Sequence, residues 1–253
     1  MHTRERRSAL LAALKEKKKV TVAELAKEFE VTTMTVRRDL KRLADENIVT
    51  LVHGGAIYNE GGLALATVGA RSLLNQQDKN ELGKYCASLV QEGNAIYLDS
   101  GSTCMSIAAA LAGRKNIAVL TNSLAVMNIL SNSSGLQLFS MGGIFDYGTN
   151  GFFGDLACRM IRGFRIDLAF LGVSSLSLAG GVMSPTASDQ ALKKTLFEAA
   201  RKKIVVVDHT KIGRESFLRV ADLREIDTIV TDKKADKDFL AGARRQGVAI
   251  VQI

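Results

Sequence analysis

The sequence predicts an α/β protein of two domains: a small N-terminal domain, and a larger one with a largely parallel sheet covered by helices. The 253-residue chain is longer than one ordinary domain needs. Residues 1–58 combine helical apolar periodicity with two short strands. From residue 76 onward, short apolar segments alternate with helical ones, which is the pattern of a sheet buried on both faces.

Composition narrows the classes of protein to consider. The sequence has no run of about 18 apolar residues and so predicts no membrane span. Its first residues are too charged for a secretory signal. Three widely spaced cysteines form neither a disulfide framework nor a zinc pattern. We therefore expect a cytoplasmic protein with no metal and no cofactor.

Positive charge is concentrated near the N-terminus. Residues 1–58 hold 12 lysines and arginines against 8 acidic residues, a net charge of +4 out of +8 for the whole chain. A small basic domain is typical of proteins that bind the phosphate backbone of nucleic acids. The alternative is a solvated, lysine-rich surface.

Capping residues predict three short helices in the N-terminal domain. Thr3 is placed to start the first helix. Thr21 and Glu24 form a capping box at the start of the second. Thr32 is the expected cap of the third helix, and Asn47 its expected end.

The residue pattern of the third helix predicts a surface that contacts DNA bases. Val36, Leu40 and Leu43 follow helical spacing and form its buried face. The outer face carries arginines, which suit bidentate contacts to guanine or phosphate. Two short strands follow, joined at Gly54–Gly55, so the expected domain is a winged helix-turn-helix. The candidate DNA-binding residues are Thr33, Met34, Thr35, Arg37, Arg38, Lys41, Arg42 and His53.

Two motifs in this region resemble the N-terminal signature of the DeoR family of bacterial transcriptional regulators. They are "VTTMTVRRDLKRL" and the "HGGA" that follows it. Residues 35–40 and 53–56 match the family pattern, whereas Leu51 stands where family members commonly carry arginine. The resemblance implies double-stranded operator DNA as a partner.

Asp39 lies among these arginines, where a carboxylate would repel DNA. We interpret Asp39 as a structural salt-bridge partner that orients Arg37 or Arg42. Residues 59–75 contain three glycines and no sustained amphipathic period, so we expect them to link domain 1–58 to domain 76–253. The alternative is that this segment packs on the second domain.

The sequence of the second domain predicts a largely parallel sheet. Ligands of such sheets bind at the carboxyl ends of the strands. Small polar residues follow several of these strands. Residues 100–103 lead directly from a strand into a helix, whose N-terminal N–H groups suit a phosphate. Residues 121–123, Gly142–Gly143 and Gly172 close three further strands. The expected strands are 95–99, 117–121, 136–141, 167–173, 203–208, 228–232 and 249–253.

The order of these pieces resembles the DeoR sensor domain, which is similar in fold to ribose-5-phosphate isomerase and glucosamine-6-phosphate deaminase. The matching stretches are "LDSGSTC", "TNSL", "GG", "DLAFLG" and "DHTK". The resemblance implies a phosphorylated sugar as effector, with its phosphate at residues 100–103. The candidate effector-binding residues are Asp99, Ser100, Gly101, Ser102, Thr103, Thr121, Asn122, Ser123, Gly142, Gly143, Gly172, Lys193, Asp208 and Lys211.

Catalysis is not expected, and we predict no catalytic residue. In ribose-5-phosphate isomerases a Glu-Lys pair precedes the D-x-S-K motif, and here Lys193 occupies the position of the base. Asp99, Asp167 and Asp189 remain as spare carboxylates, and Cys104 has no identifiable base nearby. A sugar-phosphate isomerase or deaminase-like enzyme with an accessory DNA-binding domain is the first alternative. A DNA-binding structural protein without a ligand is the second.

The sequence thus predicts a DNA-binding transcriptional regulator, a repressor of a carbohydrate-utilisation operon under the control of a phosphorylated sugar. One reading helix covers only a few base pairs, so we expect a homo-oligomer, either a dimer or a tetramer.

Overall fold

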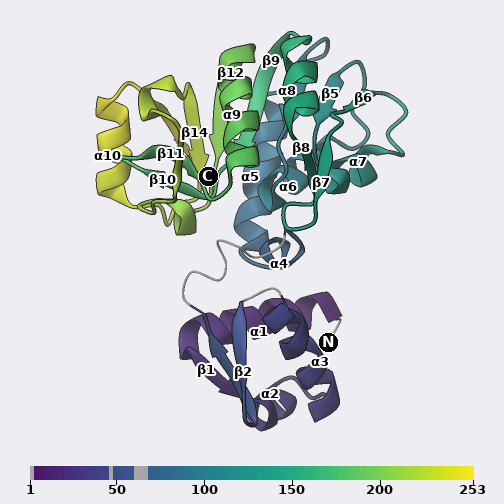
Figure 1. Cartoon of the computed structure of the whole chain (residues 1–253), viewed down its shortest axis with the longest axis vertical. Helices are drawn as coiled ribbons and strands as arrows, with labels where there is room; N and C mark the ends of the chain where they lie inside the picture. The colour runs from purple at the N-terminus through teal and green to yellow at the C-terminus, as the bar shows by residue number, and fades with distance from the viewer. Residues whose placement is uncertain (1–2, 46–47, 60–67) are drawn as a thin grey trace. The chain divides into compact units, whose positions relative to one another are not determined.

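Figure 1 shows the computed structural model, which describes residues 3–45, 48–59 and 68–253. The chain folds into two compact units, residues 1–76 and 77–253. Part of the expected linker, residues 60–67, lies outside the described residues, and a short helix α4 (Val68–Ser72) follows it. Among the described helices, none combines the length and the hydrophobicity of a membrane span.

The N-terminal unit packs three helices against a three-stranded antiparallel sheet of order β1-β3-β2. Its core contains Leu14, Leu25 and Leu40, one from each helix. This is the expected winged helix-turn-helix, with the additional strand β1 before the second helix. The elements are α1 (Thr3–Lys17), β1 (Lys19–Thr21), α2 (Val22–Glu28), α3 (Thr33–Asp45), β2 (Val49–Val52) and β3 (Gly55–Tyr58).

Local capping explains where α2 and α3 begin. The Thr21 hydroxyl accepts a hydrogen bond from the Glu24 amide, while the Glu24 carboxylate accepts one from the Thr21 amide. The Thr32 hydroxyl accepts a bond of 3.2 Å from the amide of Thr35. Both caps are therefore confirmed. Asn47, the expected end of α3, lies outside the described residues.

The wing turn is displaced by one residue from our expectation. Strand β2 ends at Val52 and β3 begins at Gly55, so His53 and Gly54 form the turn. Gly54 has a φ of +75°, the left-handed conformation that glycine adopts without strain. Gly55 serves a different purpose, because a Cβ there would lie 2.1 Å from the carbonyl oxygen of Val20. Its missing side chain lets β1 pair with β3.

Asp39 is a structural salt-bridge partner, but the partners we expected are wrong. Its carboxylate is 3% exposed and contacts Nε of Arg6 at 2.8 Å and Nε of Arg7 at 2.9 Å. Both arginines belong to α1, so the ion pairs tie α1 to α3. Arg37 and Arg42 are instead exposed on the outer face of α3.

The C-terminal unit is built on a seven-stranded parallel sheet of order β15-β14-β12-β9-β4-β5-β6. All seven expected strands are present. From β4 the chain continues to β5 and β6 on one side and then returns to β9 on the other. Ligands of open α/β sheets bind at such a reversal, here between β4 and β9. The strands are β4 (Ala95–Leu98), β5 (Ala118–Thr121), β6 (Gln137–Ser140), β9 (Ile166–Gly172), β12 (Ala200–Val206), β14 (Thr228–Thr231) and β15 (Ala249–Gln252).

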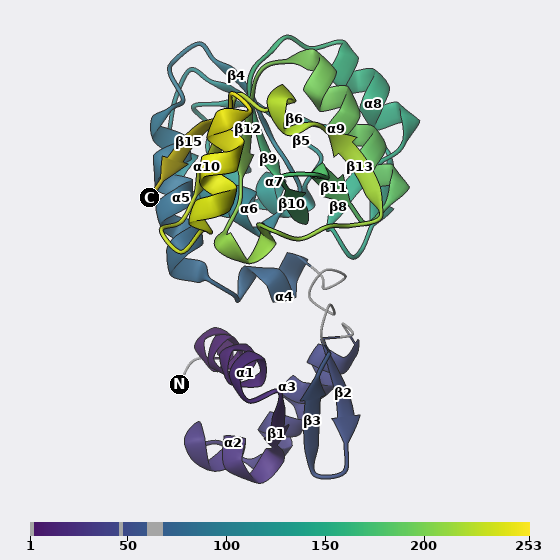
Figure 2. The same ribbon diagram turned by 90° about the vertical axis from the view of Figure 1, so that its left-hand side faces the viewer.

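Helices cover both faces of this sheet, as Figures 1 and 2 show. One apolar cluster joins the sheet to α5, α6 and α7, and a second joins it to α8, α9 and α10. Burial on both faces explains why the central strands β4, β5 and β9 are rich in apolar residues. The helices are α5 (Gln76–Ser88), α6 (Ser102–Leu111), α7 (Leu124–Leu130), α8 (Asp155–Arg162), α9 (Ala187–Ala199) and α10 (Lys237–Arg245).

Two smaller β structures were not predicted. A hairpin of β7 (Ile144–Asp146) and β8 (Gly151–Phe153) follows the edge strand β6. A separate antiparallel sheet contains β10 (Ser175–Ser177), β11 (Gly181–Ser184) and β13 (Leu218–Ala221). Two 3₁₀ turns, η2 (His209–Lys211) and η3 (Leu223–Glu225), follow β12 and β13 respectively.

Candidate functional site

The outer face of α3 is a polar and cationic surface. Val36, Leu40 and Leu43 are buried, whereas Met34 is 65% exposed. Thr35 is half-buried beside the hydroxyl of Thr32. A helix with exposed arginines on one face has the form that major-groove reading requires. The exposed candidates are Thr33, Met34, Arg37, Arg38, Lys41 and Arg42 on α3, and His53 in the wing turn.

At the reversal of strand order, Asp99 joins the ends of β4 and β9. The fully buried carboxylate accepts hydrogen bonds from the amides of Ser100 at 2.7 Å and Gly172 at 3.1 Å. A Cβ on Gly172 would lie 3.9 Å from the Asp99 carboxylate and 4.0 Å from Cα of Gly101. The strand ends that we expected to meet therefore do so.

The first turn of α6 borders open space. Gly101 is the N-cap residue, and within the described structure no side chain caps the helix. A Cβ built on Gly101 would meet no described atom within 4 Å. Ser100, Ser102 and Thr103 are each 9% exposed around it. This arrangement leaves N–H groups at a helix N-terminus available to an anion.

The polar residues at the end of β5 and directly after it are instead engaged inside the protein. Thr121 donates to the carbonyl oxygen of Leu98 at 2.7 Å, and Ser123 caps α7. Tyr97 donates to the Asn122 side-chain oxygen at 2.8 Å, and the Asn122 amide nitrogen donates to Phe152 at 3.2 Å. These residues fix the loop beside the first turn of α6.

Gly142 and Gly143 follow β6, two strands away from β4. A Cβ on Gly143 would lie 2.3 Å from the carbonyl oxygen of Phe153, and one on Gly142 would lie 3.2 Å from Leu156. These two glycines therefore allow the β7–β8 hairpin and α8 to approach the sheet closely. Their contact with an effector stays a prediction.

Lys193 lies on α9 with its ammonium between two carboxylates. It contacts Asp99 at 3.1 Å and forms a second, shorter contact with Asp189. Burial alone would lower the pKa of Lys193, but Asp189 and Asp99 outweigh this effect and hold it above its usual value. Burial raises the pKa of the Asp99 carboxyl against the attraction of Lys193. Ser184 donates to the other Asp189 oxygen at 2.6 Å, which completes a buried network.

A second charged group surrounds Asp208, which follows β12 and is 4% exposed. Burial would raise the pKa of Asp208, but the Thr210 hydroxyl and the charges of Lys79 and Lys211 hold it below its usual value. Lys79 is itself only 4% exposed. The sequence analysis missed Lys79, because a lysine on an amphipathic helix is ordinarily solvated and no local pattern marks this one as buried.

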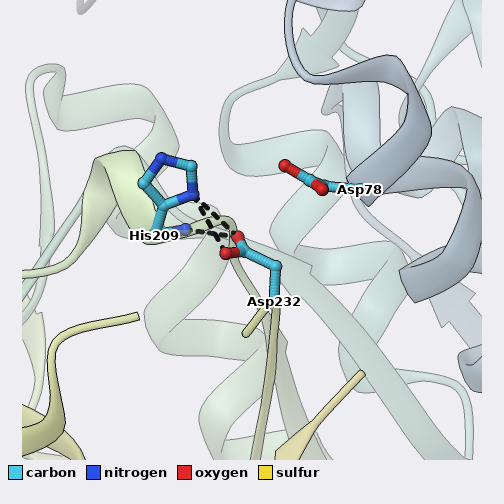
Figure 3. A group of neighbouring side chains, drawn as sticks. All are labelled: Asp78, His209 and Asp232. Carbon is cyan, nitrogen blue, oxygen red and sulfur yellow. Dashed lines mark hydrogen bonds and ion pairs between the residues drawn. The ribbon is translucent and has the colours of Figure 1, made fainter. Parts of the chain in front are cut away.

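Three potential metal ligands approach one another near this group (Figure 3): Asp78 on α5, His209 in η2 and Asp232 after β14. Their ligand atoms lie within 4.8 Å of one another. The Asp232 carboxylate accepts bonds from the backbone amide of His209 at 2.7 Å and from its Nδ1 at 3.0 Å. Lys234 contacts Asp78 at 2.8 Å. Both carboxylates therefore already have donor or cation partners within the described structure.

Cys104 in the first turn of α6 is fully buried, and burial holds the pKa of its thiol well above the usual value. An unreactive, neutral thiol is the consequence.

Both the N-terminal and the C-terminal part of the chain match models of known protein families. Residues 6–61 match the family model of the DeoR-like helix-turn-helix domain, and residues 74–233 match that of the DeoR C-terminal sensor domain. The putative aga operon transcriptional repressor of Escherichia coli O157:H7 is 30% identical over 253 residues, covering 99% of this chain and 94% of that protein. The transcriptional repressor GlcR of Bacillus subtilis is 28% identical over 251 residues, covering 99% and 96%.

Among solved structures, ribose 5-phosphate isomerase A from Methanocaldococcus jannaschii aligns with a TM-score of 0.41 and 17% identity, covering 55% of each chain. A likeness this distant carries no information about activity. The matches to the two domain models, which together span most of the sequence, show that the chain belongs to the DeoR family of helix-turn-helix regulators.

Proposed function

We propose that this protein is a repressor that binds operator DNA through α3 and the wing. A phosphorylated sugar bound by the C-terminal unit changes its affinity for that DNA. The observation that carries the DNA-binding half is the division of α3 into two faces. Aliphatic residues face the core, while arginines and lysines face solvent. In this proposal Arg37, Arg38, Lys41 and Arg42 contact DNA, and residues 1–58 form the DNA-binding domain.

The uncapped first turn of α6 supports the effector half of the proposal. Gly101 faces open space there, and Ser100, Ser102 and Thr103 surround it. Free N–H groups and hydroxyls bind phosphate oxygens without changing the ligand chemically. The sugar hydroxyls would then contact residues at the neighbouring strand ends, among them Asp208 and Lys211. Homologues named as transcriptional repressors are consistent with a sensor of this kind.

Operator affinity also leads us to propose a homo-oligomer. A single α3 reads only a few base pairs, whereas helix-turn-helix proteins reach operator-level affinity by binding two half-sites. Sedimentation of the full-length protein, free and bound to DNA, measures the oligomeric state. A monomer on a single half-site would contradict this part of the proposal.

Replacement of Arg38 by alanine tests the DNA-binding half. Using operator DNA selected from genomic fragments, we expect Arg38→Ala to lose about 1–3 kcal/mol of affinity, or about 5- to 150-fold. A contact to phosphate would also reduce the salt dependence of binding. Arg159→Ala is the matched control, because Arg159 is an exposed arginine on α8 of the C-terminal unit. If Arg38→Ala and wild type bind operator DNA with equal affinity, the proposed contact of α3 with DNA is wrong.

A thermal-shift screen tests the effector half. Pentose and hexose phosphates should raise the melting temperature of the full-length protein, and their unphosphorylated sugars should raise it less. The same compounds should change operator affinity, since an effector shifts a conformational equilibrium only if it binds the two states unequally. If no phosphorylated sugar has either effect, the sensor proposal is wrong.

A further inference from the structure

Met34, the second residue of α3, is a large apolar side chain on a cationic surface. It is 65% exposed, more than any other large apolar residue among the described residues of the N-terminal unit. A single exposed apolar residue is ordinary on a protein surface. Here its place on the helix gives it meaning, because Met34 lies where α3 is proposed to contact DNA.

Helical spacing puts Met34 in the middle of the outer face of α3. Arg38 and Lys41 follow it at i+4 and i+7, so the three side chains form one row along the helix. All three are exposed, and the buried residues of α3 lie on the opposite side. A partner that covers this row therefore covers the methionine together with the two cations.

The charge along α3 favours an approach of its N-terminal end to DNA. The first turn contains no acidic residue, and the N-terminus of a helix carries a partial positive charge. The row that starts at Met34 ends at i+11 with the exposed carboxylate of Asp45, which phosphate groups repel. In helix-turn-helix proteins the N-terminal residues of the second helix contact base edges. Met34 is therefore at the end of the row that is suited to contact bases.

The other residues at the start of α3 are suited to different contacts. The Thr35 hydroxyl lies 3.0 Å from that of Thr32, which also accepts a bond from the Thr35 amide, so both threonines belong to the helix cap. Val36 is buried, and the exposed hydroxyl of Thr33 suits hydrogen bonding. Met34 has a long, unbranched side chain without a hydrogen-bond donor. The apolar group that a base presents in the major groove is the 5-methyl group of thymine.

We propose that Met34 contacts the 5-methyl group of a thymine in the major groove of the operator half-site. This inference rests on the proposed function, since it names the base that the first turn of α3 recognises. The contact requires a T·A pair at one position of the half-site. It also distinguishes thymine from cytosine, because cytosine has no methyl group and presents a polar N4 donor. Arg38 and Lys41, further along the row, hold the helix in the groove through their charge.

Deoxyuridine in place of thymine tests the contact, because it removes one methyl group and keeps every hydrogen-bonding group of the base pair. The assay measures binding of the full-length protein to an operator duplex selected from genomic fragments, with each thymine of one half-site replaced in turn. At one position we expect wild type to bind about 4-fold more weakly, which corresponds to about 0.8 kcal/mol, the value of one buried carbon group. Met34→Ala should bind the thymine duplex more weakly than wild type does. At that position it should lose no further affinity with deoxyuridine, because the contact is already absent.

Two further variants serve as controls. Met34→Leu keeps a similar side-chain volume and should retain the preference for thymine. Leu156→Ala is the matched control, because Leu156 is an exposed apolar residue on α8 of the C-terminal unit, and its loss should leave the response to deoxyuridine unchanged. Alanine favours helices, so Met34→Ala should fold, and an unchanged melting temperature verifies this.

The outcomes separate this assignment from the proposed function. If deoxyuridine changes the affinities of wild type and Met34→Ala equally at every position, Met34 does not contact a thymine methyl group, and the proposed function stands. If Met34→Ala binds every duplex as wild type does, the exposed methionine serves a different partner and the assignment is wrong. If wild type selects no operator sequence from the fragments, the assignment and the proposed function are both wrong.

Discussion

The ion pairs of Asp39 lead to a quantitative prediction about the N-terminal unit. We expect Asp39→Asn to destabilise this unit strongly, because both of its ion-pair partners lie on α1. The substitution preserves the size of the side chain and removes the charge that balances Arg6 and Arg7. Removing one partner of a buried ion pair leaves the other charge without compensation in the interior.

The burial of the three side chains sets the magnitude. Such substitutions cost about 3–5 kcal/mol when both partners are buried. Asp39 is 3% exposed and Arg6 is 10% exposed, but Arg7 is 22% exposed and can recover part of its hydration. We therefore expect the lower end of the range, about 3 kcal/mol. At about 1.4 kcal/mol for each factor of ten, this corresponds to roughly a 100-fold change in the unfolding equilibrium.

Amide hydrogen exchange measured by mass spectrometry on the full-length protein resolves the two units. The slowest amides of α1 and α3 should exchange about 100-fold faster in Asp39→Asn, while those of the seven-stranded sheet remain unchanged. Asp45→Asn, an exposed position on the same helix, should stay within about 0.5 kcal/mol of wild type. If protection of α1 and α3 in Asp39→Asn equals that in Asp45→Asn, the ion pairs do not stabilise the unit.

Three further predictions follow from single residues. Gly55→Ala should cost about 1–3 kcal/mol and expose the amides of β1, because its Cβ would lie 2.1 Å from Val20; hydrogen exchange measures this. Folding lowers the pKa of Asp208, so the charged carboxylate stabilises the protein above about pH 4, and this contribution is lost as the pH falls through the folded pKa. The melting temperatures of wild type and Asp208→Asn should therefore converge as the solution is acidified. A difference in melting temperature that does not change with pH would contradict this. Burial raises the pKa of Cys86 to about 12, so iodoacetamide at pH 8 should label Cys86 and Cys104 only in denaturant; rapid native labelling would show that these thiols are accessible.

Several parts of the fold could be predicted because their signals are local. The central strands contain apolar runs, such as residues 95–98 of β4, and the buried face of α3 follows from helical spacing alone. The missed strands, β1, β7, β8, β10, β11 and β13, span only three or four residues each. Segments this short do not establish a period. Their pairing depends on the tertiary arrangement.

In the candidate site too, only the features that follow from local sequence patterns could be predicted. Asp99, Gly101 and Gly172 could be placed together because parallel strands end at one edge of a sheet. The partners of Asp39 could not be found, since Arg6 and Arg7 lie more than 30 residues earlier in the chain. Lys79 is 4% exposed, but nothing in the local sequence distinguishes it from a solvated lysine. Such contacts between distant segments exist only once the chain has folded.

The pairing of β4 with β9 has a consequence for biosynthesis. Ile96 pairs with Leu168, so the centre of the sheet cannot close until some 70 further residues have left the ribosome. Chains generally fold from the N-terminus during translation, and the described hydrophobic core of the N-terminal unit ends with Leu73 and Leu74, far before β9. The N-terminal unit should therefore be able to fold before the central sheet is complete. A product truncated after this unit would be expected to keep a folded helix-turn-helix but to lack the unit that we propose as the sensor.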